Sequence, residues 1–313
     1  MHIDVFGLIG AAAGGFLGAT FGALVAFVFT GFAVLIGIAA LIGSGNSGFL
    51  DSIAFGSVFG PHISFAAGVA AAGYAYRRGY LTSGRDIVTP LVSLARPSVL
   101  LVGAGFGLLG YVLQQVIAII PWLGSHTDSV ALTVVVSALI VRLAFGRSGI
   151  IGADNEGRTG WARFAPNAEH AWLAYQQKPA MAVLLGVFVG GISAWAGVAL
   201  LQSFPDAGGV IFVGFGISAV SLLFLAFGIL VPATHHITLV SAVAANALLL
   251  RAPGLDPSWV VIFGAIFGGL TALVGEAFSR FWLIRGDTHI DPPASAIWPM
   301  TTISLVTVAL LPL

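Results

Sequence analysis

The chain contains no cysteine and few charged side chains. Only 8% of its 313 residues are charged, and acidic and basic residues balance to a net charge of zero. The lack of cysteine excludes disulfides, thiolate metal ligands and cysteine nucleophiles. Without a basic run or a basic excess, the chain shows no nucleic-acid-binding surface. We therefore expect no nucleic-acid partner.

Apolar residues dominate the rest of the chain. They make up 58% of it, and the mean hydropathy is +1.03, whereas a soluble domain carries about 25% charged residues. Such a chain cannot cover a surface that faces water, so its main solvent is lipid. The apolar runs are long and continuous, which indicates helices and not the alternating strands of a membrane barrel. We predict an all-α polytopic membrane protein without a removable signal peptide.

The lengths of the apolar runs predict ten membrane segments. A crossing takes about 20 apolar residues, so we split the long run 5–43 near Thr30 and Gly31. The other predicted segments are 55–76, 97–118, 127–147, 179–202, 210–230, 235–250, 259–281 and 289–311. This gives a first membrane repeat over 1–147, a polar cytoplasmic linker over 148–178 and a second membrane repeat over 179–313.

The second half repeats the polar residues of the first half in the same order. The run Pro61-His62-Ile63-Ser64 matches His235-His236-Ile237-Thr238. The run His126-Thr127-Asp128 matches His289-Ile290-Asp291. The shared order and the similar spacing of the two matches predict an internal repeat.

Glycines recur at matched places as well. Gly10 and Gly14 correspond to Gly186 and Gly190, and Gly103 and Gly107 correspond to Gly264 and Gly268. In lipid, helices associate where small residues let their backbones approach closely. We interpret these positions as helix contacts within the fold, with contacts between protomers of a homo-oligomer as the alternative.

The basic residues predict the orientation. If all ten segments cross, eleven of the twelve Lys and Arg residues lie on one side, and Arg251 alone lies on the other. The positive-inside rule makes the basic side cytoplasmic, including 77–96 and 148–178, and puts both termini outside. Five crossings per half invert the second repeat. If segments three and eight are re-entrant, the split becomes ten to two and the repeats are parallel. We favour the inverted arrangement. We expect the protein in the cytoplasmic membrane of a bacterium or an archaeon.

Segments three and eight are the predicted functional region. Glycine and polar residues interrupt the stretch 44–61, Pro232 precedes segment eight, and the apolar helices that follow are short. Interrupted segments at matching places in two repeats indicate a transport site. The candidate site residues are His62, His126, Asp128, His235, His236, His289 and Asp291.

Each half offers two histidines and one aspartate, with His235 as an extra donor. Two imidazoles and one carboxylate suit zinc, iron or manganese, so we predict metal ligation by the six matched residues. The aspartates also fit helix caps, because Asp291 stands directly before Pro292. Helix N-termini favour anions, which keeps a bicarbonate-like anion or a neutral solute as an alternative.

These patterns predict a transporter or channel for a small ion, first a divalent metal cation, in contact with membrane lipids. We expect no enzyme, although an intramembrane metal hydrolase and a structural membrane subunit are further hypotheses. In architecture alone, the two-fold repeat with broken segments resembles inverted-repeat channels and transporters, including the urea and ammonium channels. That resemblance assigns no role to any residue of this chain.

Overall fold

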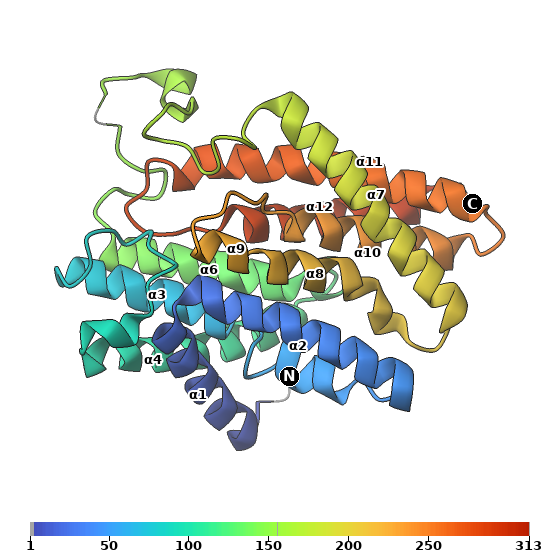
Figure 1. The fold of residues 1–313 in the computed structure, drawn as a ribbon, viewed down its shortest axis with the longest axis horizontal. Helices are drawn as coiled ribbons and strands as arrows, with labels where there is room; N and C mark the ends of the chain where they lie inside the picture. Colours follow the sequence, from blue (N-terminus) through green and yellow to red (C-terminus); the bar gives the residue numbers. More distant parts are fainter. Residues whose placement is uncertain (1–2, 155, 313) are drawn as a thin grey trace.

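The computed structural model describes residues 3–154 and 156–312, and their regular structure is helical. Within these ranges there is no β-strand, only an isolated bridge between Gly84 and Thr288. The first half contains α1 (Val5–Phe21), α2 (Ala23–Ser44), α3 (Ser64–Arg77), α4 (Pro97–Ala118), α5 (Leu123–His126) and α6 (Ser129–Phe145). The second half contains α7 (Pro179–Ser203), α8 (Val213–Ser221), α9 (Leu223–Ala226), α10 (His235–Arg251), α11 (Pro257–Phe278) and α12 (Pro292–Leu310). In Figure 1 the first half lies below and the second half above.

The helix lengths make the chain an integral helical membrane protein. In the described part, six helical segments are long and apolar enough to cross a bilayer. They are Ala23–Ser44, Pro97–Ala118, Pro179–Ser203, Gly208–Ala226, Pro257–Leu283 and Pro292–Leu310. The apolar helices α1 and α6 are shorter, at 17 residues each. Large apolar side chains such as Phe188 and Ile192 of α7 are exposed, which suits contact with lipid tails.

Proline and aspartate mark where several helices begin. Proline is the first residue of α4, α7, α11 and α12, where its missing N–H costs no helical hydrogen bond. Asp128, Asp256 and Asp291 each precede a helix and accept a backbone N–H from its first turn. These signals explain why the predicted segment 97–118 coincides with α4.

The predicted break near Thr30 and Gly31 is wrong, because both residues lie inside α2. The chain turns at Gly22, whose φ of 85° and ψ of 146° suit glycine. Thr30 donates its hydroxyl to the Phe59 carbonyl oxygen, at 2.5 Å. At Gly31 a Cβ would lie 2.8 Å from the Ala219 Cβ of α8. Gly31 therefore permits helix contact and does not end a helix.

The matched glycines lie in close contacts within the fold. A Cβ on Gly107 of α4 would collide with the Ala11 carbonyl oxygen of α1, and one on Gly268 of α11 would collide with the Gly186 carbonyl oxygen of α7. The backbones of α1 and α4, and of α7 and α11, therefore touch at glycine. These contacts fit the interpretation of the glycines as packing positions.

Three segments that each carry arginine meet at one end of the molecule, on the left in Figure 1: 77–96, 146–153 and 284–291. The Arg85 guanidinium donates to the Ile284 carbonyl oxygen at 3.1 Å, and the Ala153 N–H donates to the Arg285 carbonyl oxygen at 3.1 Å. The loop that follows Arg251 lies at the opposite end.

Helices α3 and α10 are short, and each packs among the other helices of its half. They have 14 and 17 residues, and most of these are buried. The chain before α3 is a series of turns, in which the Ile63 and Ser64 N–H groups both donate to the Gly60 carbonyl oxygen. The chain before α10 has no regular structure and pairs with the central linker through Gln176. Irregular backbone at membrane depth is tolerated where it borders a cavity or packs in protein.

Candidate functional site

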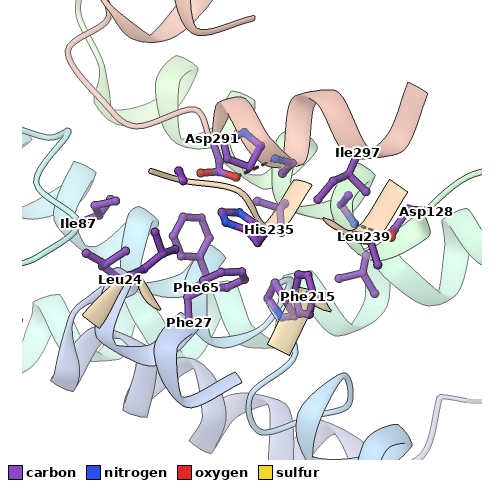
Figure 2. A pocket seen from close by; sticks show the side chains of 18 of the residues that line it. Leu24, Phe27, Phe65, Ile87, Asp128, Phe215, His235, Leu239, Asp291 and Ile297 are labelled. Carbon is purple, nitrogen blue, oxygen red and sulfur yellow. Dashed lines mark hydrogen bonds between the residues drawn. The ribbon is translucent and has the colours of Figure 1, made fainter. Parts of the chain in front are cut away.

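A cavity of about 230 Å³ lies where the two halves meet. Helices α2, α3, α6, α8, α10 and α12 contribute to it, and the linker closes part of it with Trp172 and Leu173. Figure 2 shows His235 in the middle of the view, with Asp291 on one side, Asp128 on another and phenylalanine rings below. The apolar side chains around it include Leu24, Phe27, Phe55, Phe65, Ile87, Val134, Phe212, Phe215, Leu239 and Ile297.

Asp291 directly precedes α12 and lines the cavity. Its Oδ2 accepts the Ala294 N–H at 2.8 Å, which caps the helix. Its Oδ1 lies 3.3 Å from Nε2 of His289. The His289 ring is buried and meets the Phe65 ring edge to face, with centroids 6.0 Å apart. One oxygen of this carboxylate therefore serves the helix, and the other forms a pair with an imidazole.

Asp128 directly precedes α6 and reaches the same cavity from the first half. Its Oδ1 accepts the Ala131 N–H at 2.8 Å, so it caps α6 as Asp291 caps α12. This cap requires only one of the two carboxylate oxygens. The two predicted aspartates thus combine capping with a place on the cavity wall.

His235 is the first residue of α10 and lines the cavity. Its ring centroid lies 4.6 Å from that of Phe27 and 6.2 Å from that of Phe215. The residue is 6% exposed, and its Nδ1 has no hydrogen-bond partner within 3–154 and 156–312. A buried nitrogen without a partner beside a cavity can bind a ligand.

His62 and His236 are buried but do not line this cavity. Both ring nitrogens of His236 lack hydrogen-bond partners in the described part of the chain. The His236 ring packs against Gly275 of α11, where a Cβ would lie 2.9 Å from Nε2. The His62 carbonyl oxygen packs so closely on Gly110 of α4 that a Cβ there would collide with it. These two matched histidines therefore pack behind the cavity wall.

His126 lies away from the cavity. It belongs to the short helix α5, and its Nδ1 lies 2.8 Å from the Trp122 carbonyl oxygen and 2.9 Å from the Ser125 hydroxyl. Its ring stacks on the Trp122 indole, with centroids 4.9 Å apart. Of the predicted residues, the structure therefore brings Asp128, His235, His289 and Asp291 together at one cavity, and leaves His62, His126 and His236 off its wall.

The predicted metal ligands do not converge as a set of three. Among the described residues, three carboxylate or imidazole ligand atoms lie within 4.8 Å of one another only at Glu156, Glu169 and His170, in the linker. At the cavity, the close pair of ligand atoms is that of His289 and Asp291. This pair could hold a cation together, whereas a complete zinc or manganese shell would need further ligands.

The charge on the described cavity wall is negative. Asp128 and Asp291 are its formally charged side chains, and no described Lys or Arg lines it. The N-termini of α6, α10 and α12 border the cavity with their partial positive charges, and the two capping carboxylates offset those of α6 and α12. The wall is otherwise apolar and aromatic, so it can hold a small ligand that carries one charged group.

Sequence patterns did not identify the aromatic wall or the role of the linker. The chain has 23 phenylalanines, and nothing in their spacing distinguishes those at the cavity from those that face lipid. Trp172 is far in sequence from the helices that form most of the wall. The linker that carries it is held by the Gln176 amide, which bonds both backbone groups of Ala233 at 3.1 Å.

These features define an integral membrane protein with a buried, mainly apolar cavity that contains two carboxylates. A family described as a family of unknown function (DUF7973) matches residues 1–170 and residues 155–312, and the chain belongs to this family. No curated protein and no solved structure shows significant similarity to it.

Proposed function

We propose that the protein is a membrane channel or transporter for a small cation, and that the cavity is its substrate site. The observation that carries the proposal is the pair of aspartates, one from each half, on an otherwise apolar wall. Ionisable side chains inside membrane proteins are costly and usually mark an ion or substrate path. Two carboxylates without a lysine or arginine on the described wall favour a cation over an anion.

Matched positions of the two halves support a two-fold site. In the alignment that pairs His62 with His236, the wall positions 61 and 65 correspond to 235 and 239. In the alignment that pairs Asp128 with Asp291, the wall positions 130, 131 and 134 correspond to 293, 294 and 297. A substrate site between two repeats requires equivalent positions to face each other in this way.

We therefore propose ten segments in two repeats of five. The first repeat consists of α1, α2, α3, α4 and α6, and the second of α7, α8 with its flanking short helices, α10, α11 and α12. Five segments per half would invert the second repeat. The basic loops that meet at one end, opposite Arg251, support a cytoplasmic side there and termini on the outside.

A divalent metal stays within this proposal. Nε2 of His289 and Oδ1 of Asp291 are 3.3 Å apart, so both atoms could bind one ion. The first half offers Asp128 without His126, whose ring stacks on Trp122. A metal would therefore bind first to the second-half pair.

Uptake into proteoliposomes tests the proposal. Mn²⁺ and tetramethylammonium serve as cations of two kinds, and chloride serves as the anion. Asp128→Asn and Asp291→Asn remove the charge but keep the cap, because asparagine caps helices as well as aspartate does. We expect cation uptake, reduced about 100-fold by either variant, since removing one partner of a buried ion pair costs about 3 kcal/mol.

Asp256→Asn is the matched control. Asp256 caps α11 by accepting the Ser258 N–H at 2.8 Å, but it lies outside the cavity. That hydrogen bond also holds the pKa of its carboxyl below the usual range, so the control removes a real charge. Uptake of chloride alone, or cation uptake that ignores both cavity variants, would contradict the proposal.

A further inference from the structure

The aromatic wall narrows the kind of cation that fits the cavity. The ring centroids of Phe27 and Phe65 are 5.8 Å apart, as are those of Phe27 and Phe215 and those of Phe55 and Phe215. These four rings form one continuous surface, and the His235 ring joins it at Phe27. An inorganic ion that sheds its water needs several oxygen or nitrogen ligands in place of that water, and these rings supply none.

The polar atoms of the wall are too dispersed to replace a hydration shell. His289 and Asp291 form one close pair, and no third His, Asp or Glu ligand atom lies within 4.8 Å of both in the described chain. Asp128 reaches the cavity at the start of α6, apart from Asp291 in Figure 2. The wall thus offers single carboxylates for one hydrogen-bonded or ion-paired group, not a chelating cage.

The size of the cavity points to one small organic molecule. Its volume of about 230 Å³ exceeds the roughly 150 Å³ of an apolar cavity that binds benzene. It lies below the roughly 300 to 1,000 Å³ of sites for drug-sized ligands. A molecule of about one ring with a short charged group would fill it.

We propose that the substrate is a small organic cation, an ammonium group on an apolar body, whose charge lies at Asp128 or Asp291 and whose body lies against Phe27, Phe65 and Phe215. Aromatic faces attract such cations through their quadrupole, most strongly when water is excluded. The buried His235, with its unpartnered Nδ1 beside the rings, supplies a polar contact for the ligand. This inference rests on the proposed function and specifies its substrate class.

Uptake of phenyltrimethylammonium by proteoliposomes tests it, because this permanently charged probe crosses lipid poorly by itself. Tetramethylammonium has the same head group without the ring, benzoate has the ring with the opposite charge, and Mn²⁺ has charge without an apolar body. We expect phenyltrimethylammonium to be taken up with a KM at least about tenfold below that of tetramethylammonium, since the ring adds buried apolar area. Benzoate and Mn²⁺ should not compete.

Two variants test whether the aromatic faces of the wall, and not only its apolar character, bind the cation. Phe27→Leu and Phe65→Leu keep the wall apolar but remove the ring faces, so we expect about a tenfold rise in the KM for phenyltrimethylammonium. Phe188→Leu, on the exposed side of α7, is the control and should leave the KM unchanged.

The results that would contradict an organic cation as substrate differ from those that would contradict cation transport itself. Uptake of Mn²⁺ that requires Asp128 and Asp291, without uptake of phenyltrimethylammonium, would overturn the organic cation and leave cation transport standing. Equal KM values for the two ammonium probes, or indifference to both phenylalanine variants, would also overturn it. Uptake of benzoate or chloride alone would overturn both proposals.

Discussion

The two halves of the molecule use the same polar residues in different ways. In the second half, His289 lies 3.3 Å from Asp291 and both line the cavity. In the first half, Asp128 lines the cavity, but His126 turns away and stacks on Trp122. A carboxylate that caps a helix is fixed by the backbone, whereas an imidazole two residues earlier is fixed by its local neighbours. The matched sequences therefore place the two aspartates alike in the structure, but not the two histidines.

The approaches to the two short central helices differ as well. The chain before α3 is held by turns at Gly60 and by the Thr30 hydroxyl of α2, which donates to the Phe59 carbonyl oxygen. The chain before α10 bonds to the linker, through Gln176 and through the Tyr175 hydroxyl, which donates to the Val231 carbonyl oxygen at 2.5 Å. Through these hydrogen bonds the linker supports the approach to α10 on the second-half side of the cavity.

The two halves differ most at Arg142, which has an apolar residue as its counterpart in the second half. Its replacement should have the largest effect on stability. Arg142 is 1% exposed and donates to the carbonyl oxygens of Trp282 and Thr288 and to the Thr288 hydroxyl, at 2.7 to 3.0 Å. In the alignment that pairs Asp128 with Asp291, the second half has Leu305 at this position. We expect Arg142→Met to lower the free energy of unfolding by about 3 to 5 kcal/mol, because buried acceptors lose a charged donor.

Denaturant unfolding in detergent measures this loss. Arg147→Met is the control, since Arg147 is exposed near the end of the same helix and its side chain should contribute little. A loss from Arg142→Met no larger than that from Arg147→Met would show that the arginine does not hold the two halves together.

The glycine contacts should behave alike in both halves. Gly107→Leu and Gly268→Leu each force a side chain into the backbone of a neighbouring helix, so we expect both to cost about 3 kcal/mol. Gly105→Leu, two residues from Gly107 on α4, points into open space and should cost little. Thermal unfolding of the three variants checks this. Unequal losses of stability from Gly107→Leu and Gly268→Leu would contradict an equivalent role for the two contacts.

The linker contact should affect only the second half. Gln176→Leu leaves the buried N–H and C=O of Ala233 without partners, so we expect a loss of about 2 kcal/mol. Hydrogen exchange should then increase in 228–234 and stay unchanged in 55–63. Gln202→Leu, at an exposed position near the end of α7, is the control. Faster exchange in both segments would contradict support confined to one half.

Replacing the histidines should have the smallest effect. It is also the most direct test of whether His289 and His126 differ in their contribution to the cavity. We expect His289→Ala to reduce cation uptake about tenfold, or about 1.4 kcal/mol, because it removes the partner of Asp291. His126→Ala should leave uptake unchanged, because its ring contacts Trp122 and Ser125 instead of the cavity. Equal losses in the two variants would restore the symmetric site that the sequence predicted.

Much of the fold was predictable because helix starts carry local signals. The lengths of the apolar runs predicted segments 97–118 and 179–202, which match α4 and α7 closely, and Asp291 with Pro292 marked the start of α12. The break between α1 and α2 was missed, because a glycine that turns the chain and a glycine that permits helix contact look the same in sequence. Gly22 is the first kind and Gly31 the second.

The sequence by itself determined the membrane class, several helix starts and the place of the two aspartates before helices, since each depends on local composition or on a cap a few residues away. Only the tertiary structure decided which histidines reach the cavity, and that phenylalanines from α2, α3 and α8 enclose it with Trp172 of the linker. These contacts join segments far apart in the chain. Their geometry depends on how the helices cross, and local sequence patterns do not encode that crossing.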